Sequence, residues 1–264
     1  MPSIFGIDFS GSVNAGQKIW IASGRVEDDR LVIEKCIRGE ALPGSSRVRA
    51  ACLAALREFI CSAGDSLIGL DFPLSVPGEL LAGQTWLQFI RTFEMRFATP
   101  QQFRQDCFNR SPGRELKRRT DRETRTPFSP YNLRLYRQTF YGLHDVIAPL
   151  VRQRAVRVLP MQVRHPGLPG LIEICPASTL KRIMLYHPYK GRSSERRAER
   201  LTIIRALRRA GVQLAGQLKL IVLADPEGDA LDSVLAAWAA FRAWPQIDRQ
   251  PFDHLYRREG YVFV

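Results

Sequence analysis

Three short apolar runs follow one another at the beginning of the chain, at residues 3–10, 17–26 and 31–37. A charged segment at 27–30 separates the last two runs and has the composition of a hairpin turn. Apolar runs of this length, joined by connections this short, are typical of neighbouring strands. The pattern therefore predicts an antiparallel meander of three strands.

A helix and a fourth strand are expected next. Between residues 45 and 63, apolar side chains recur at helical spacing, with Ser45 or Ser46 as a candidate N-cap. Residues 67–71 are apolar except for the terminal Asp71, and a strand that follows a crossover helix usually joins the sheet in parallel. Because the run is apolar on both faces, we expect this strand at the centre of the sheet.

The pattern changes between residues 78 and 160. This segment is rich in arginine and aromatic residues, and its 15 Lys and Arg against 7 Asp and Glu give it a net charge of +8. Thr99-Pro100, followed by Gln102, has the signature of a helix start. We therefore expect an inserted subdomain of helices and loops at about 78–160.

Strand and helix patterns resume after the insertion. We expect a strand at 170–176, helices at 177–185, 194–210 and 229–244, and a terminal edge strand at 261–264, whereas 217–223 fits either a strand or a helix. This order of elements is that of an RNase H-like α/β fold with additions. It predicts a single domain over 1–264, built on a mixed five-stranded sheet with flanking helices.

The composition is that of a globular protein with a strong positive charge. No apolar run is long enough to span a bilayer, and the first residues lack a basic leader, so we expect neither a membrane partner nor a signal peptide. The net charge of +13 favours nucleic acid or an acidic membrane face as a partner, although an arginine-rich codon bias gives the same excess. Five cysteines without CxxC spacing indicate reduced thiols and a cytoplasmic location.

Carboxylates stand on the predicted strands and at the start of the last long helix. The five candidate catalytic carboxylates are Asp8, Asp71, Glu173, Asp229 and Asp232. Burying a carboxylate among apolar residues is costly unless a cation or hydrogen bonds offset it, and carboxylate oxygens suit Mg²⁺ and Mn²⁺. We predict that Asp8, Asp71 and Asp232 hold such ions, with Asp8 as the bridging ligand, and that two ions clamp a scissile phosphate.

Each of these acids also has a structural explanation. Asp8 and Asp71 can cap the turns that follow their strands. Glu173 can pair with Arg164 or Lys181, and the two helix acids can serve as an N-cap and as a first-turn charge that offsets the helix dipole. The prediction of a metal site therefore depends on the whole set rather than on any one member.

Basic side chains in and after the insertion are candidates for contacts with phosphate. They are Arg114, Lys117, Arg118, Arg119 and Lys181. Phosphate contacts supply most non-specific affinity for nucleic acid, so we predict that this set binds nucleic acid, although a solvated helix with Arg–Glu pairs would show the same run. The nearby aromatic residues are expected to pack inward: Tyr131, Tyr136, Phe140 and Tyr141.

Several segments resemble blocks of a known family, the domain of unknown function 429. The similar segments are 6–11, 18–22, 68–73, 173–181, 228–238 and 258–263. This resemblance implies an RNase H-like fold and a nuclease activity. The family is similar to the RuvC-type resolvases, whose acids lie on the first strand, the fourth strand and the last helix, and Asp8, Asp71 and Asp232 stand on the matching elements. Asp229 would be a further acid one turn away, and Glu173 has no firm acidic counterpart.

The sequence thus predicts a metal-dependent nuclease that hydrolyses phosphodiester bonds in DNA or RNA. Two alternatives belong to other classes of protein. One is a non-catalytic nucleic-acid-binding protein whose acids are structural. The other is an actin-like ATP-dependent phosphotransferase, because residues 8–12 faintly resemble the phosphate loop of that group.

Overall fold

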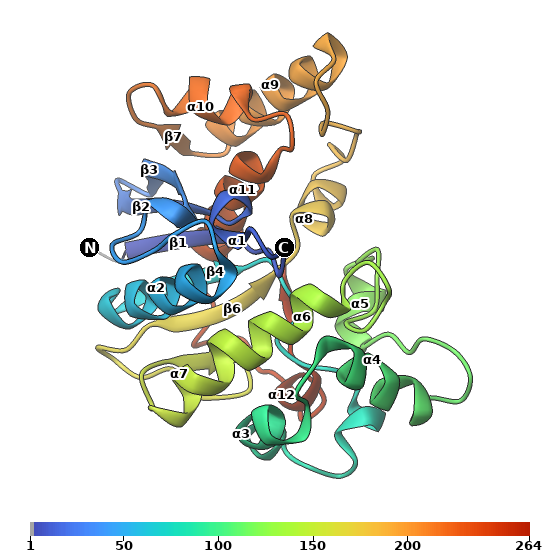
Figure 1. Cartoon of the computed structure of the whole chain (residues 1–264). Helices are drawn as coiled ribbons and strands as arrows, with labels where there is room; N and C mark the ends of the chain where they lie inside the picture. The colour runs from blue at the N-terminus through green and yellow to red at the C-terminus, as the bar shows by residue number, and fades with distance from the viewer. Residues whose placement is uncertain (1–2) are drawn as a thin grey trace.

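The computed structural model describes residues 3–264 and has an α/β architecture, with a mixed sheet and flanking helices (Figure 1). Within this range the sheet has eight strands, in the order β5-β6-β4-β1-β2-β3-β7, with β8 beside β6. The strands are β1 (Ser3–Asp8), β2 (Trp20–Glu27), β3 (Arg30–Arg38), β4 (Ser66–Leu70), β5 (Arg157–Leu159), β6 (Gly170–Ile174), β7 (Val212–Leu214) and β8 (Val262–Phe263). The sheet is larger than the five strands predicted, because the very short β5 and β7 were not expected and the terminal strand, expected at 261–264, pairs in it as β8.

The centre of the sheet has the predicted arrangement. β1, β2 and β3 pair antiparallel as a meander, in which Asp8 lies opposite Trp20. β4 pairs in parallel with β1 on one side and with β6 on the other. Both β4 and β6 are buried along their whole length, which explains their unbroken apolar character. Because parallel strands point the same way, the carboxyl ends of β1, β4 and β6 lie at one edge of the sheet.

Helices pack on both faces of the sheet (Figure 1). They are α1 (Ala15–Lys18), η1 (Gly39–Ala41), α2 (Arg49–Ser62), η2 (Gly78–Leu81), α3 (Trp86–Arg96), α4 (Pro100–Asn109), α5 (Arg119–Glu123), α6 (Tyr136–Gly142), η3 (Leu143–Ile147), α7 (Ala148–Arg152), α8 (Pro176–Arg182), α9 (Ser194–Arg209), α10 (Leu218–Ala224), α11 (Asp229–Ala243) and α12 (Tyr256–Glu259). The apolar side of α2 packs in a core with Ile7 and Ile21. α11 packs in a second core with Ile4 and Ala22, whose side chains point to the opposite face.

The structure corrects one expected helix cap, settles one ambiguous segment and confirms one capping box. α2 begins at Arg49, and Val48 occupies its cap position without a side-chain hydrogen bond, so the expected serine cap is wrong. The ambiguous segment 217–223 lies mainly in helix α10. The capping box of Thr99 and Gln102 is confirmed.

The insertion is helical and folds around its own aromatic side chains. The ring of Phe93 lies 5.0 Å from that of Phe97 and 5.4 Å from that of Phe103. Tyr131 and Phe140 are buried as expected, and these side chains join the same core as α2. β5 then returns the chain to the central sheet, beside β6.

No helix between residues 3 and 264 combines the length and the apolar character that crossing a membrane requires.

All five cysteines are free thiols, in agreement with the absence of a disulfide pattern. Burial raises the pKa of Cys36 to about 11 and that of Cys107 to about 12, so both thiols are protonated near neutral pH.

Candidate metal centre

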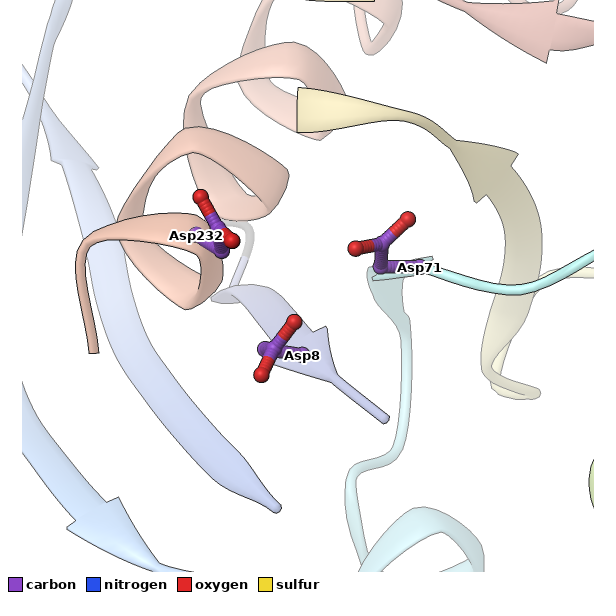
Figure 2. A group of neighbouring side chains, drawn as sticks. All are labelled: Asp8, Asp71 and Asp232. Atoms are coloured by element: carbon purple, nitrogen blue, oxygen red, sulfur yellow. The ribbon is translucent and has the colours of Figure 1, made fainter. Parts of the chain in front are cut away.

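Three aspartates from distant parts of the sequence converge at the carboxyl edge of the sheet (Figure 2). Asp8 is the last residue of β1, Asp71 directly follows β4, and Asp232 lies in the first turn of α11. Each offers one carboxylate oxygen, and these three oxygens lie within 4.8 Å of one another. The structure thus brings together the three residues that the sequence predicted as metal ligands.

Two glycines explain how α11 comes close enough to bring Asp232 to this edge. A Cβ atom added at Gly6 of β1 would lie 2.1 Å from the backbone nitrogen of Ala237, and one added at Gly69 of β4 would lie 2.7 Å from the backbone oxygen of Ala236. Side chains at these positions would hold the helix away from the sheet. Their absence allows direct backbone contact, so the first turn of α11 lies beside the ends of β1 and β4.

The three carboxyl groups disfavour one another's ionisation. Burial, followed by repulsion from Asp232 and Asp229, raises the pKa of Asp8 well above its ordinary value. Burial and repulsion from Asp232 likewise raise the pKa of Asp71 to about 8. A divalent cation would reverse both effects, because it attracts the ionised carboxylates and replaces lost water as their partner.

Tyr189 and Lys190, in the loop before α9, complete the acidic cluster. The hydroxyl of Tyr189 donates to Oδ1 of Asp232 at 2.5 Å. The ammonium of Lys190 lies 2.7 Å from Oδ2 of Asp232 and 3.2 Å from Oδ1 of Asp229. Neither residue is predictable from the sequence, because a single tyrosine and a single lysine in a loop have no periodicity or spacing that distinguishes them.

Lys190 supplies one positive charge beside four carboxyl groups, and burial raises the pKa of each of these groups. Its charge interacts with Asp8, Asp229 and Asp232, and it also lowers the pKa of Asp71. Its side chain is 50% exposed, so water reaches it from the outer side of the cluster. Both oxygens of Asp232 accept hydrogen bonds, but each carboxylate oxygen has two lone pairs, and a cation can share them. The cluster therefore retains oxygen ligands for a divalent ion, which would favour the ionised form of these carboxyl groups.

Asp229 lies beside this group but outside the three-carboxylate cluster. It is the first residue of α11, and Gly228, in a left-handed conformation, occupies the cap position. The alternative explanation of Asp229 as a side-chain N-cap is therefore wrong. Its carboxylate instead accepts a hydrogen bond from Lys190, and burial raises its pKa against the effect of that ammonium.

Glu173 has a different partner from those considered in the sequence. Its two carboxylate oxygens accept hydrogen bonds from the guanidinium of Arg118, and Oε2 also accepts one from the backbone N–H of Leu74. Arg118 is 1% exposed and forms a second, two-point contact with Asp121. The expected pairing of Glu173 with Arg164 or Lys181 is therefore wrong, and so is the prediction that Arg118 contacts nucleic acid.

The other predicted phosphate-binding residues have varied surroundings. Arg119 is half-exposed and pairs with Glu123 and Asp253. Lys117 donates to the backbone oxygen of Thr126, and Lys181 to that of Arg125. Arg114 is exposed. These four side chains are more exposed than Arg118, whose guanidinium is engaged by Asp121 and Glu173.

The geometry at the sheet edge is the basis for assigning a function. Comparison with models of protein families, with curated proteins and with solved structures gave no match for the chain.

Proposed function

We propose that the protein is a metal-dependent nuclease with an RNase H-like fold, which hydrolyses phosphodiester bonds in DNA or RNA. One observation carries the proposal: carboxylate oxygens of Asp8, Asp71 and Asp232 lie within 4.8 Å of one another, on the first strand, the fourth strand and the last long helix. The order of elements and the resemblance to the domain of unknown function 429 support the same assignment.

The donor set suits Mg²⁺ or Mn²⁺. It consists only of carboxylate oxygens, which are the ligands that these hard cations prefer. Asp8 stands on the central strand β1, which pairs with β4 and contacts α11, so Asp8 would hold an ion together with both Asp71 and Asp232. Bound ions at such a site would lower the pKa of an attacking water and stabilise the leaving oxygen of a phosphodiester.

The remaining groups of the cluster orient the ligands and the substrate. Tyr189 and Lys190 hold the carboxylate of Asp232 from two sides, which fixes its position relative to Asp8. The ammonium of Lys190 also offers a positive charge to a phosphate that approaches the cluster. The net charge of +13 supports association with a polyanion, and we propose nucleic acid as the partner and the cytoplasm as the location.

The proposal is tested with Asp8→Asn. This change removes one anionic ligand but keeps the size of the side chain, so we expect loss of Mn²⁺-dependent cleavage of labelled oligonucleotides while the protein stays folded. Mn²⁺ at one hundred times its Kd should also stabilise the unmodified protein by about 2.7 kcal/mol. We therefore expect Mn²⁺ to raise the melting temperature of the unmodified protein but not that of the variant.

Asp28→Asn is the matched control, because Asp28 is an exposed residue in the turn between β2 and β3. It should leave cleavage and the response to Mn²⁺ unchanged. The nuclease assignment would be wrong if Asp8→Asn cleaved as fast as the unmodified protein. Salt-sensitive binding of nucleic acid with no cleavage under Mg²⁺ or Mn²⁺ would instead support the non-catalytic alternative.

A further inference from the structure

A cavity of about 500 Å³ adjoins the acidic cluster. Asp71, Asp232 and Lys190 form part of its lining, so a ligand held at the cluster extends directly into it. The volume lies within the range of about 300–1,000 Å³ that is typical of pockets for single small ligands. The cavity therefore has room for one compact group attached to a substrate phosphate that is held at the cluster.

The lining away from the cluster is mainly apolar and contains aromatic rings. Phe128 and Pro127 come from the insertion, and Pro176 comes from the start of α8. Tyr186, in the loop that leads to Lys190, is 48% exposed although it is a large aromatic residue. Flat apolar surfaces of this kind suit the face of an aromatic ligand, and nucleobases stack on them without regard to base identity.

Polar groups in the cavity differ in their freedom to bind a ligand. Arg118 and Glu173 also line it, but they satisfy each other. Gln138 donates from its Nε2 to the backbone oxygen of Asp71 at 2.6 Å, which fixes the orientation of its amide. The Oε1 atom of Gln138 is thus left as an acceptor for an exocyclic amino group, a hydrogen bond that glutamine commonly makes with bases.

We propose that this cavity binds one unpaired nucleobase, whose phosphate lies at the acidic cluster. This inference rests on the proposed nuclease function and specifies its substrate class as single-stranded or locally unpaired nucleic acid. A base that is paired and stacked in a duplex is surrounded by its neighbours, and it reaches a pocket of this size only after leaving the stack. Lys190 lines the cavity and also pairs with Asp232 of the cluster, so its ammonium contacts the phosphate of the nucleotide whose base occupies the cavity.

The test measures binding of a fluorescein-labelled oligonucleotide by polarisation, with Ca²⁺ present. The same sequence is used as a single strand and as a blunt duplex, in DNA and in RNA. Whichever of DNA and RNA binds more tightly is identified as the natural substrate. We expect tighter binding of the single strand. Tyr186→Ala and Phe128→Ala should each weaken that binding by about 5- to 150-fold, the loss typical of one stacked base.

Met184→Ala is the control, because Met184 lies in the same loop as Tyr186, is 83% exposed and does not line the cavity. It should leave the affinity unchanged. Equal affinity for single strand and duplex, together with no effect of either aromatic variant, would overturn the inference.

A cleavage assay on the same oligonucleotides with Mn²⁺ separates the two proposals. Preferential cleavage of the duplex, unaffected by the aromatic variants, would retain the nuclease function and reject the base-binding cavity. Binding that depends on Tyr186 and Phe128, without cleavage of either form, would retain the cavity as a binding site and reject the nuclease function.

Discussion

Replacing Arg118 with methionine is expected to destabilise the protein severely. The guanidinium is 1% exposed and donates five hydrogen bonds, two to Asp121, two to Glu173 and one to the backbone oxygen of Glu259. Methionine would leave two buried carboxylates without their cation, and removal of one partner of a buried ion pair costs about 3–5 kcal/mol. That loss is a large part of the roughly 5–15 kcal/mol that stabilises a typical domain.

The measurement is the free energy of unfolding in urea at pH 7, followed by tryptophan fluorescence. Arg119→Met is the matched control, because Arg119 is the next residue and also makes two ion pairs, but its side chain is 43% exposed. Exposed pairs of this kind contribute about 0–1 kcal/mol. Replacement of Arg118, Asp121 and Glu173 together by apolar residues should recover much of the stability.

A loss below about 1 kcal/mol for Arg118→Met, or one equal to that of Arg119→Met, would refute the argument. Weakened binding of oligonucleotides with unchanged stability would indicate instead that Arg118 contacts phosphate, as the sequence analysis had suggested.

Two further predictions concern the assembly and the charge of the acidic cluster. Gly6→Ala should push α11 away from the sheet, because the added Cβ would collide with the helix backbone. We expect a loss of about 1–3 kcal/mol or more in urea unfolding and weaker Mn²⁺ binding by titration. Unchanged stability and unchanged Mn²⁺ affinity would contradict the close contact. The pKa of Asp71, raised to about 8, means that folded protein retains a proton that unfolded chains release near pH 4. With a chelator present, the free energy of unfolding should therefore fall by up to about 1.4 kcal/mol for each unit that the pH rises between about 4 and 8. Urea unfolding at pH 5, 7 and 9 measures this slope, and Asp71→Asn should reduce it. A steeper slope in the variant would show that the pKa of Asp71 is not raised by folding.

The carboxylates of the site were predictable because each stands next to a strong local pattern. Asp8 and Asp71 interrupt or end apolar runs, and parallel pairing brings the ends of such strands to one edge. Asp232 lies in the first turn of a long apolar helix. Predicting that the three aspartates converge also required that α11 meet the carboxyl ends of β1 and β4. The close contact between this helix and the two strands depends on Gly6 and Gly69.

The parts that escaped prediction depend on tertiary contacts. Arg118 belongs to an arginine-rich run that resembles a solvated surface, and only the docking of the insertion against β6 buries it beside Glu173. Lys190 reaches the cluster from a loop, where no periodicity marks its direction. β5 and β7 have three residues each, too few for alternation to identify a strand.

The close packing of α11 against β1 and β4 also determines when, during synthesis, the three-aspartate cluster can form. Asp8 and Asp71 emerge early in synthesis, whereas the helix that brings Asp232 to them begins only at residue 229. A growing polypeptide that stops before this helix has Asp8 and Asp71, at the ends of the paired strands β1 and β4, but lacks the third carboxylate. Under the proposed function, a nascent chain that has not yet exposed Asp232 would lack a complete set of metal ligands and would not hydrolyse the RNA around it.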